Sequence, residues 1–180
     1  MSIYISILRG INVTGRRVKM DALKKMYLDL KFENVTSYIQ SGNVIFEYKK
    51  TNVALLEKQI EAAITTTFKF DSPVIVKEID SLQKIINANP FLKDKTKELT
   101  YLHVTFLSTT PDALLFDKIL IGDYKDDAIA LVNDAIYLYC PNGYSNSKFT
   151  NSFLEKKLKV IATTRNWNTT LELLAIASLN

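Results

Sequence analysis

The first half of the chain switches several times between the two-residue period of a strand and the longer period of a helix. Residues 3–8 alternate and are rich in isoleucine, which predicts a strand. In the order of the chain, the pattern then predicts a helix at 21–30, strands at 35–39 and 44–48, a helix at 53–68 and a strand at 74–76. Because Gly42 lies in the polar break at 40–43, the two middle strands should form a hairpin.

The second half repeats this order after a connecting segment. We expect a short helix at 80–88 and a charged link at 93–98. The pattern then predicts a strand at 101–107, a helix at 111–120, hairpin strands at 128–132 and 136–140, a helix at 150–158, a truncated strand at 160–162 and a terminal helix at 169–178.

A β-α-β-β-α-β order that occurs twice predicts an α+β protein of two ferredoxin-like subdomains in a pseudo-duplicated arrangement. We place the first subdomain at residues 1–79, a helical and charged link at 80–99 and the second subdomain at 100–180. Helices should cover one face of each sheet.

Composition is that of a soluble globular protein, with 47% hydrophobic residues among 180. No apolar run approaches the length of a membrane span, and the first residues lack the features of a secretion signal, so we expect a cytoplasmic protein that does not interact with membranes. The single Cys140 lies in an apolar strand pattern, which favours a buried, unreactive thiol.

The net charge of +4 is unevenly distributed. Residues 1–78 carry 12 Lys and Arg against 8 Asp and Glu, whereas residues 79–180 carry 11 of each. Residues 9–25 hold six basic side chains and one acidic one, and residues 112–134 hold six acidic side chains and two lysines. Such segregation favours a directed electrostatic role.

The basic segment begins with a loop in which Gly10 and Gly15 bracket four residues. This spacing is similar to that of a nucleotide-phosphate loop, but Arg16 and Arg17 stand where that loop needs a lysine and a hydroxyl. Nucleotide hydrolysis is therefore disfavoured. Glycine backbone and guanidinium groups still suit an anion, so Arg9, Asn12, Arg16 and Arg17 are candidate ligand-binding residues.

Three further polar segments accompany this loop. The turn at 40–43 offers Gln40, Ser41 and Asn43, although a plain turn explains the same residues. The segment at 141–148 ends in Lys148, which we expect in the first turn of a helix capped by Ser147 or Thr150, where a cation suggests a bound anion.

The last polar segment, residues 163–169, contains Arg165 and Asn166 as candidates. Thr169 and Glu172 fit a capping box for the terminal helix. We expect Trp167 to pack between subdomains rather than to stack on a base.

Catalytic constellations are weak in this sequence. His103, the only histidine, lies in the middle of a predicted strand, which favours packing over general-base catalysis. There is no cysteine and histidine cluster for zinc, so we expect no metal, and nothing indicates a particular cofactor.

Five segments together resemble a bacterial family of uncharacterised proteins, domain of unknown function 1697. They are Leu-Arg-Gly-Ile-Asn-Val at 8–13 with Gly15, Tyr-Ile-Gln-Ser-Gly-Asn-Val at 38–44, Asn-Pro-Phe at 89–91, Ser-Lys at 147–148 and Thr-Arg-Asn-Trp-Asn-Thr at 164–169. The resemblance implies a duplicated ferredoxin-like α+β fold and no established activity. Thr14 replaces a glycine of the family, and Lys31 lies where the family tends to have one, so the first helix should end differently.

These observations lead to three hypotheses. The first is a protein that binds a phosphate-bearing small molecule, nucleotide or nucleic acid in a basic cleft between subdomains. The second is an enzyme that stabilises an anionic transition state with the same cations, using Ser41, Tyr38 or Ser147. The third is a structural network, without ligand, that includes Arg9, Asn12, Asn166 and Asn168. The sequence indicates no oligomeric state.

Overall fold

The computed structural model describes residues 1–13 and 15–179, so Thr14 and Asn180 lie outside the described residues. The chain forms two compact units, which we describe separately. The first unit comprises Met1–Gln83 together with the chain from Glu172 on, and the second comprises Lys84–Leu171.

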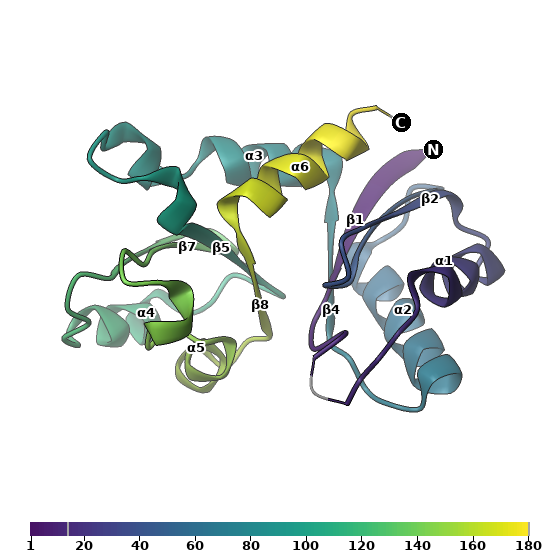
Figure 1. The fold of residues 1–180 in the computed structure, drawn as a ribbon, viewed down its shortest axis with the longest axis horizontal. Coiled ribbons are helices and arrows are strands. Elements are labelled where there is room, and N and C mark those ends of the chain that lie inside the picture. The colour runs from purple at the N-terminus through teal and green to yellow at the C-terminus, as the bar shows by residue number, and fades with distance from the viewer. Residues whose placement is uncertain (14, 180) are drawn as a thin grey trace. The chain divides into compact units, whose positions relative to one another are not determined.

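The first unit contains one antiparallel sheet and two helices on one of its faces (Figure 1). Its elements are β1 (Ser2–Leu8), α1 (Met20–Asp29), β2 (Glu33–Tyr38), β3 (Asn43–Tyr48), α2 (Val53–Phe68) and β4 (Val74–Glu78). The strands are ordered β2-β3-β1-β4, and each pairs antiparallel with its neighbour. α3 (Ile79–Asn87) then leads into the second unit.

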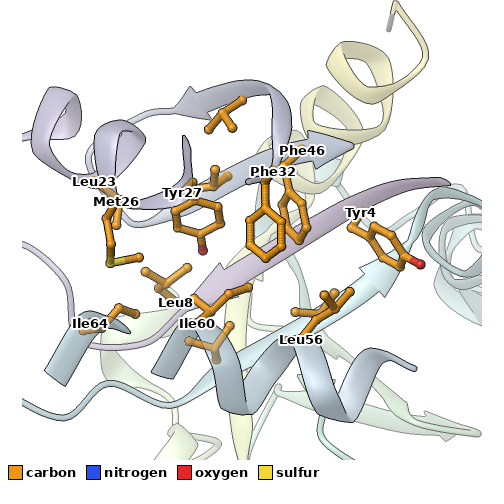
Figure 2. Close-up of a cluster of buried hydrophobic side chains, with 14 of the residues drawn as sticks. Tyr4, Leu8, Leu23, Met26, Tyr27, Phe32, Phe46, Leu56, Ile60 and Ile64 are labelled. Atoms are coloured by element: carbon orange, nitrogen blue, oxygen red, sulfur yellow. The ribbon is translucent and has the colours of Figure 1, made fainter. Parts of the chain in front are cut away.

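The core of the first unit lies between its sheet and its helices (Figure 2). α2 contributes Leu56, Ile60 and Ile64, whose spacing places them on one helix face, and all three are fully buried. Phe32 stacks on Phe46 of β3 with ring centroids 4.4 Å apart. The apolar residues that recur with helical spacing in this part of the sequence are therefore the residues that α2 buries in the core.

The second unit repeats the arrangement. After the short 3₁₀ helices η1 (Pro90–Lys93) and η2 (Leu99–Tyr101) come β5 (Leu102–Leu107), α4 (Ala113–Leu120), β6 (Ala128–Val132), β7 (Ala135–Tyr139), η3 (Tyr144–Asn146), α5 (Asn151–Leu158), β8 (Ala162–Asn166) and α6 (Trp167–Ala177). The strand order β6-β7-β5-β8 is again antiparallel throughout. Leu154 and Leu158 of α5 pack with Phe116 and Ile119 of α4 in its core.

The predicted α+β fold with two sheets is confirmed. The expectation that helices cover only one face of each sheet does not hold for the second sheet, because α4 and α5 pack on the face of Ile136 and Leu138, whereas on the opposite face the Tyr137 hydroxyl donates to the Ile85 carbonyl of α3 at 2.6 Å.

The end of the chain differs from the prediction. β8 is a full strand, paired with β5 from Ala162 opposite Leu107 to Asn166 opposite His103. Because its Thr and Arg residues are polar, β8 has no apolar periodicity that would predict its full length.

The first helix ends in a left-handed turn. α1 stops at Asp29, and Lys31 adopts a φ of 66°, a left-handed conformation that glycine favours.

Among the described residues, no helix is both long enough and apolar enough to span a bilayer.

Candidate functional site

The basic loop, described at residues 9–13 and 15–18, lies at one end of the first sheet, where β1 ends and β3 and β4 begin. The Leu8 N–H donates to the Gly42 carbonyl at 2.8 Å, and the Arg9 N–H donates to the Pro73 carbonyl at 3.0 Å. The Ser72 hydroxyl donates to the Arg9 carbonyl at 2.7 Å. The loop is thus held between the hairpin turn and the segment before β4.

Asn12 shapes this loop from within. Its φ of 56° turns the backbone, and its N–H donates to the Arg16 carbonyl at 2.8 Å. The side-chain oxygen accepts from the Val18 N–H at 2.7 Å, and the side-chain amide donates to the Gln40 carbonyl at 2.7 Å. The Asn12 side chain therefore bonds within the loop through its oxygen and to the hairpin turn through its amide nitrogen.

Arg16 folds back over the protein. Its guanidinium carbon lies 5.3 Å from the centre of the Phe70 ring, and Nη1 donates to the Asp71 carbonyl at 3.3 Å. A cation over an aromatic face is favourable, and the hydrogen bond adds to it. Arg16 thus closes the loop against the segment that precedes β4.

The hairpin turn needs glycine at position 42. Gly42 has a φ of 75°, and a Cβ there would lie 2.9 Å from the Leu8 Cβ. Beside it, the buried Asn43 donates to the Tyr38 carbonyl at 3.2 Å and to the Ser41 hydroxyl at 2.9 Å. These residues shape the turn that supports the basic loop.

A pocket of about 460 Å³ opens beside the loop at the start of α1. Its lining residues are Asn12, Arg17, Val18, Lys19, Met20 and Gln40. Arg17 and Lys19 are exposed, and neither forms an ion pair or a side-chain hydrogen bond with the described residues. Lys19 is also the N-cap residue of α1 and makes no side-chain capping bond. Lys19 is not among the residues predicted from the sequence, although a cation at a helix start is a signal for an anion site.

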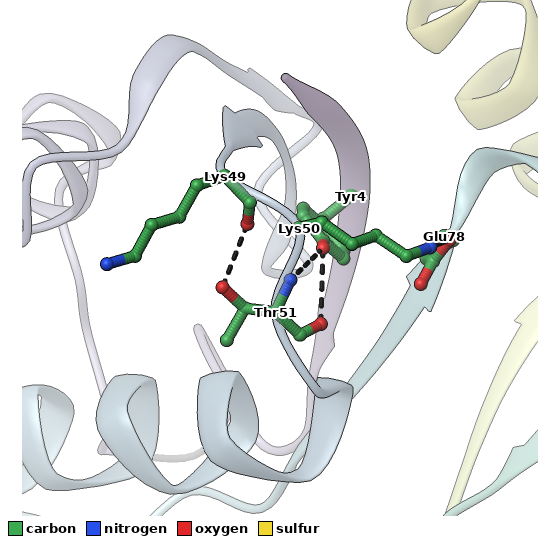
Figure 3. A network of polar contacts seen from close by, with 5 residues as sticks. All are labelled: Tyr4, Lys49, Lys50, Thr51 and Glu78. Carbon is green, nitrogen blue, oxygen red and sulfur yellow. Dashed lines mark hydrogen bonds and ion pairs between the residues drawn. The ribbon is translucent and has the colours of Figure 1, made fainter.

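Lys50, at the opposite end of the same sheet, is a surface cation with an acidic partner (Figure 3). It forms an ion pair with Glu78, whose carboxylate raises the pKa of Lys50. Nearby, the Tyr4 hydroxyl accepts from the Thr51 N–H at 3.0 Å and donates to the Thr51 carbonyl at 3.2 Å. This network fixes the chain before α2 and leaves no unpaired cation at Lys50.

Lys148 lies in the second unit and lines a pocket of about 290 Å³. The other lining residues are Tyr124, Lys125, Asp127, Asn142 and Asn146. The expectation that Lys148 lies in the first helical turn is wrong, because α5 begins at Asn151 and the Thr150 hydroxyl caps it by accepting from the Phe153 N–H. Lys148 instead donates to the Asp123 carbonyl at 3.4 Å.

Arg165 and Asn166 end β8. The Asn166 side chain accepts from the Thr169 N–H at 2.7 Å, so Asn166 caps α6 and the predicted capping box of Thr169 and Glu172 is wrong. Arg165 donates to the Thr164 carbonyl at 3.0 Å, and burial lowers its pKa to about 10. Trp167 is buried.

The candidate residues thus fall into two groups. The structure brings Arg9, Asn12, Arg16, Arg17, Gln40, Ser41 and Asn43 together at one end of the first sheet. Lys148, Arg165 and Asn166 belong to the second unit, where Lys148 alone of the three lines the pocket described above. A cleft shared by both groups stays a prediction.

Comparison with known proteins identifies the family of this chain. A family model described as a protein of unknown function, DUF1697, matches residues 1–137. The chain belongs to the DUF1697 family. The resemblance noted from its motifs is therefore confirmed, and Thr14, one departure of this DUF1697 chain from the family pattern, lies outside the described residues. No curated protein matches the chain.

A solved structure is also similar to this DUF1697 protein. It is the structure of the conserved bacterial protein SP0830 from Streptococcus pneumoniae, with a TM-score of 0.74 and 21% sequence identity over 99% of both chains. At this identity the match supports the fold of the whole chain and carries no function.

His103 in β5 and Cys140 directly after β7 of this DUF1697 protein are packed side chains. His103 stacks on Tyr144 at 4.8 Å, and burial lowers the pKa of its imidazole, which is therefore neutral at pH 7. Burial raises the pKa of the Cys140 thiol to about 11, so it stays protonated. Within the described residues, no three His, Cys, Asp or Glu side chains gather into a group that could hold a metal ion.

Proposed function

We propose that the first unit binds a phosphate-bearing ligand in the pocket at the start of α1. The observation that carries this proposal is that Arg17 and Lys19 line one pocket and that their side chains make no ion pair or hydrogen bond with the described residues. A volume of about 460 Å³ is within the range of about 300–1,000 Å³ typical of small-molecule sites.

The charge at this position suits a phosphate better than a carboxylate. The start of α1 contributes a partial positive charge of about 0.5. Lys19, as N-cap, offers no acceptor to the first helical N–H groups, which are therefore available to an anion. Two full cations and a helix start balance the double charge of a phosphate monoester, whereas a carboxylate carries a single charge.

The polar residues around the pocket divide into two roles. Asn12, Arg16 and Asn43 have their side chains bonded within the loop and the turn, so we assign them to shaping the site. The Gln40 side chain makes no hydrogen bond with the described residues, so we assign it, with Arg17 and Lys19, to the ligand. Part of the predicted structural network thus becomes the support of a binding site.

The pocket lining favours binding over catalysis. The described residues that line it carry amide, guanidinium, ammonium and apolar side chains, and none has a hydroxyl, thiol, imidazole or carboxyl group. The Ser41 hydroxyl accepts a hydrogen bond from Asn43 and is absent from the lining. Among the side chains that commonly act as nucleophiles or general acids and bases, the described lining therefore offers only the amino group of Lys19.

A thermal-shift experiment at low salt tests the proposal and separates the sources of phosphate. Pyrophosphate, ATP and single-stranded RNA are compared with acetate and chloride as controls. A ligand at 100 times its dissociation constant adds about 2.7 kcal/mol of stability. We expect a higher midpoint with a phosphate compound, and a shift with RNA alone would identify a nucleic-acid site. No shift with any phosphate compound would overturn the proposal.

We also propose that both units have the ferredoxin-like topology. Each has the element order β-α-β-β-α-β, and the orders β2-β3-β1-β4 and β6-β7-β5-β8 place the equivalent strands in the same positions.

The subdomain limits 1–79, 80–99 and 100–180 and the cytoplasmic location stay predictions. Limited proteolysis that cleaves first within residues 80–99 would support those limits, and first cleavage inside either sheet would contradict them.

A further inference from the structure

Each of the two sheets ends in two edge strands, which are β2 and β4 in the first and β6 and β8 in the second. An edge strand presents unpaired N–H and C=O groups that another extended chain can bind, and proteins usually block such edges. The four edges of this protein differ in how they are blocked.

The β4 and β8 edges are covered by carboxylates from the helix that precedes each strand. In the first unit, Glu61 and Glu57 of α2 accept from the N–H groups of Val74 at 3.0 Å and Val76 at 2.9 Å. In the second unit, Glu155 of α5 accepts from the Ala162 N–H at 3.0 Å. The duplicated fold uses the same device at both edges.

The β2 edge is interrupted by its own backbone. Its pairing with β3 shifts register between Glu33 and Thr36, and Asn34 has a φ of 47°. The Asn34 amide donates to the Glu47 carboxylate at 2.8 Å. A bulge with polar side chains makes an edge a poor template for another strand.

The β6 edge has none of these features. Its sequence is Ala-Ile-Ala-Leu-Val, without charge or proline, and it pairs with β7 in unbroken register from Ala128 to Val132. All five residues are partly exposed. Beyond the ladder with β7, no hydrogen bond among the described residues reaches the β6 backbone.

Acidic residues flank this edge at both ends. Asp126 and Asp127 directly precede β6 and follow Lys125, and Asp134 lies in the turn after β6, so three acidic side chains and one lysine flank the strand. We propose that β6 binds an extended segment of a partner protein by strand addition, and that this segment has alternating apolar residues flanked by lysine or arginine. The backbone ladder provides affinity, and the flanking charges select a basic segment.

A second copy of this chain fits the edge poorly. Antiparallel self-pairing centred on Ala130 would place Asp126 opposite Asp134 of the other copy at both ends. Like charges directly opposite each other destabilise a strand pair. A partner segment with lysine or arginine at the same positions would instead be attracted to the carboxylates of Asp126 and Asp134.

Fluorescence anisotropy with synthetic peptides tests this proposal on the intact protein. The probe has alternating Val and Thr flanked by Lys. One control carries Pro in place of the central Val, and another carries Glu in place of Lys. We expect the Lys-flanked peptide to bind and the Pro peptide to bind about tenfold more weakly, because strand hydrogen bonds are lost. The Glu-flanked peptide should not bind.

Two measurements locate the site. Bound peptide should slow amide hydrogen exchange in Ala128–Val132, and Asp126→Asn combined with Asp134→Asn should weaken binding of the Lys-flanked peptide. Three results would overturn the proposal: no binding of the Lys-flanked peptide, equal binding of the Pro peptide, or sedimentation showing a dimer that protects the same amides without peptide.

Discussion

The variant Gly42→Ala tests most directly how the hairpin turn supports the basic loop, because Gly42 packs closely against Leu8 at the end of β1. In Gly42→Ala the new Cβ would lie 2.9 Å from the Leu8 Cβ and 3.1 Å from the Ile11 Cγ1, at a φ of 75°. The backbone strain costs about 1–2 kcal/mol, and the overpacking about 1–3 kcal/mol. The lower chain entropy of alanine in the unfolded state returns about 0.4–1 kcal/mol. We therefore expect a loss of about 1–5 kcal/mol, with a central value of about 3 kcal/mol.

Gly15→Ala is the matched control. Gly15 has a φ of 81° and nothing within 4 Å of its ideal Cβ, so only the backbone strain applies. We expect a loss of about 1 kcal/mol or less. Urea denaturation followed by far-ultraviolet circular dichroism measures both variants. Equal losses for the two alanines would refute the claim that the packing of Gly42 on Leu8 and Ile11 matters.

Three further predictions concern strain, titration and capping. Ile39 is a β-branched residue with a φ of 49°, so Ile39→Asn should raise the free energy of unfolding by about 0.5–1 kcal/mol. The measurement is a higher urea midpoint, and an unchanged or lower midpoint would contradict this prediction. Burial raises the pKa of Glu57 above 4.5, so the folded state binds its proton more readily than the unfolded state. The stability of the wild type relative to Glu57→Gln should therefore increase as the pH falls from 7 towards 4.5, and a decrease in urea titrations would contradict the assignment. Asn166→Ala should cost about 1 kcal/mol in thermal unfolding through loss of the α6 cap, and a neutral result would contradict that role.

Elements with strong apolar periodicity were predictable from the sequence. α2, at Val53–Phe68, has the predicted bounds because Leu56, Ile60 and Ile64 recur on one face. β8 was not fully predictable, because its residues Thr163–Asn166 are polar and its extent is set by pairing with β5, some 60 residues earlier in the chain. The start of α6 was misplaced because several Thr and Asn residues were equally good caps by sequence.

The candidate site shows a similar division. The sequence indicated that the basic loop and the turn are polar and rich in hydrogen-bonding groups, and the structure places them together. It did not indicate that Arg16 would lie on Phe70, more than 50 residues away, or that the Arg17 side chain would have no partner among the described residues. Which of two adjacent arginines packs on the protein depends on long-range contacts that periodicity does not encode.

Isothermal titration of pyrophosphate at low salt tests the central claim most directly. The variant carries Arg17→Ala with Lys19→Ala, and the control is Lys58→Ala, which removes an exposed α2 cation outside the pocket lining. Charged hydrogen bonds contribute about 1.5–3 kcal/mol each, so we expect the double variant to bind at least about tenfold more weakly. The control should bind like the wild type. Equal affinity of the wild type and the double variant would contradict a phosphate site at the start of α1.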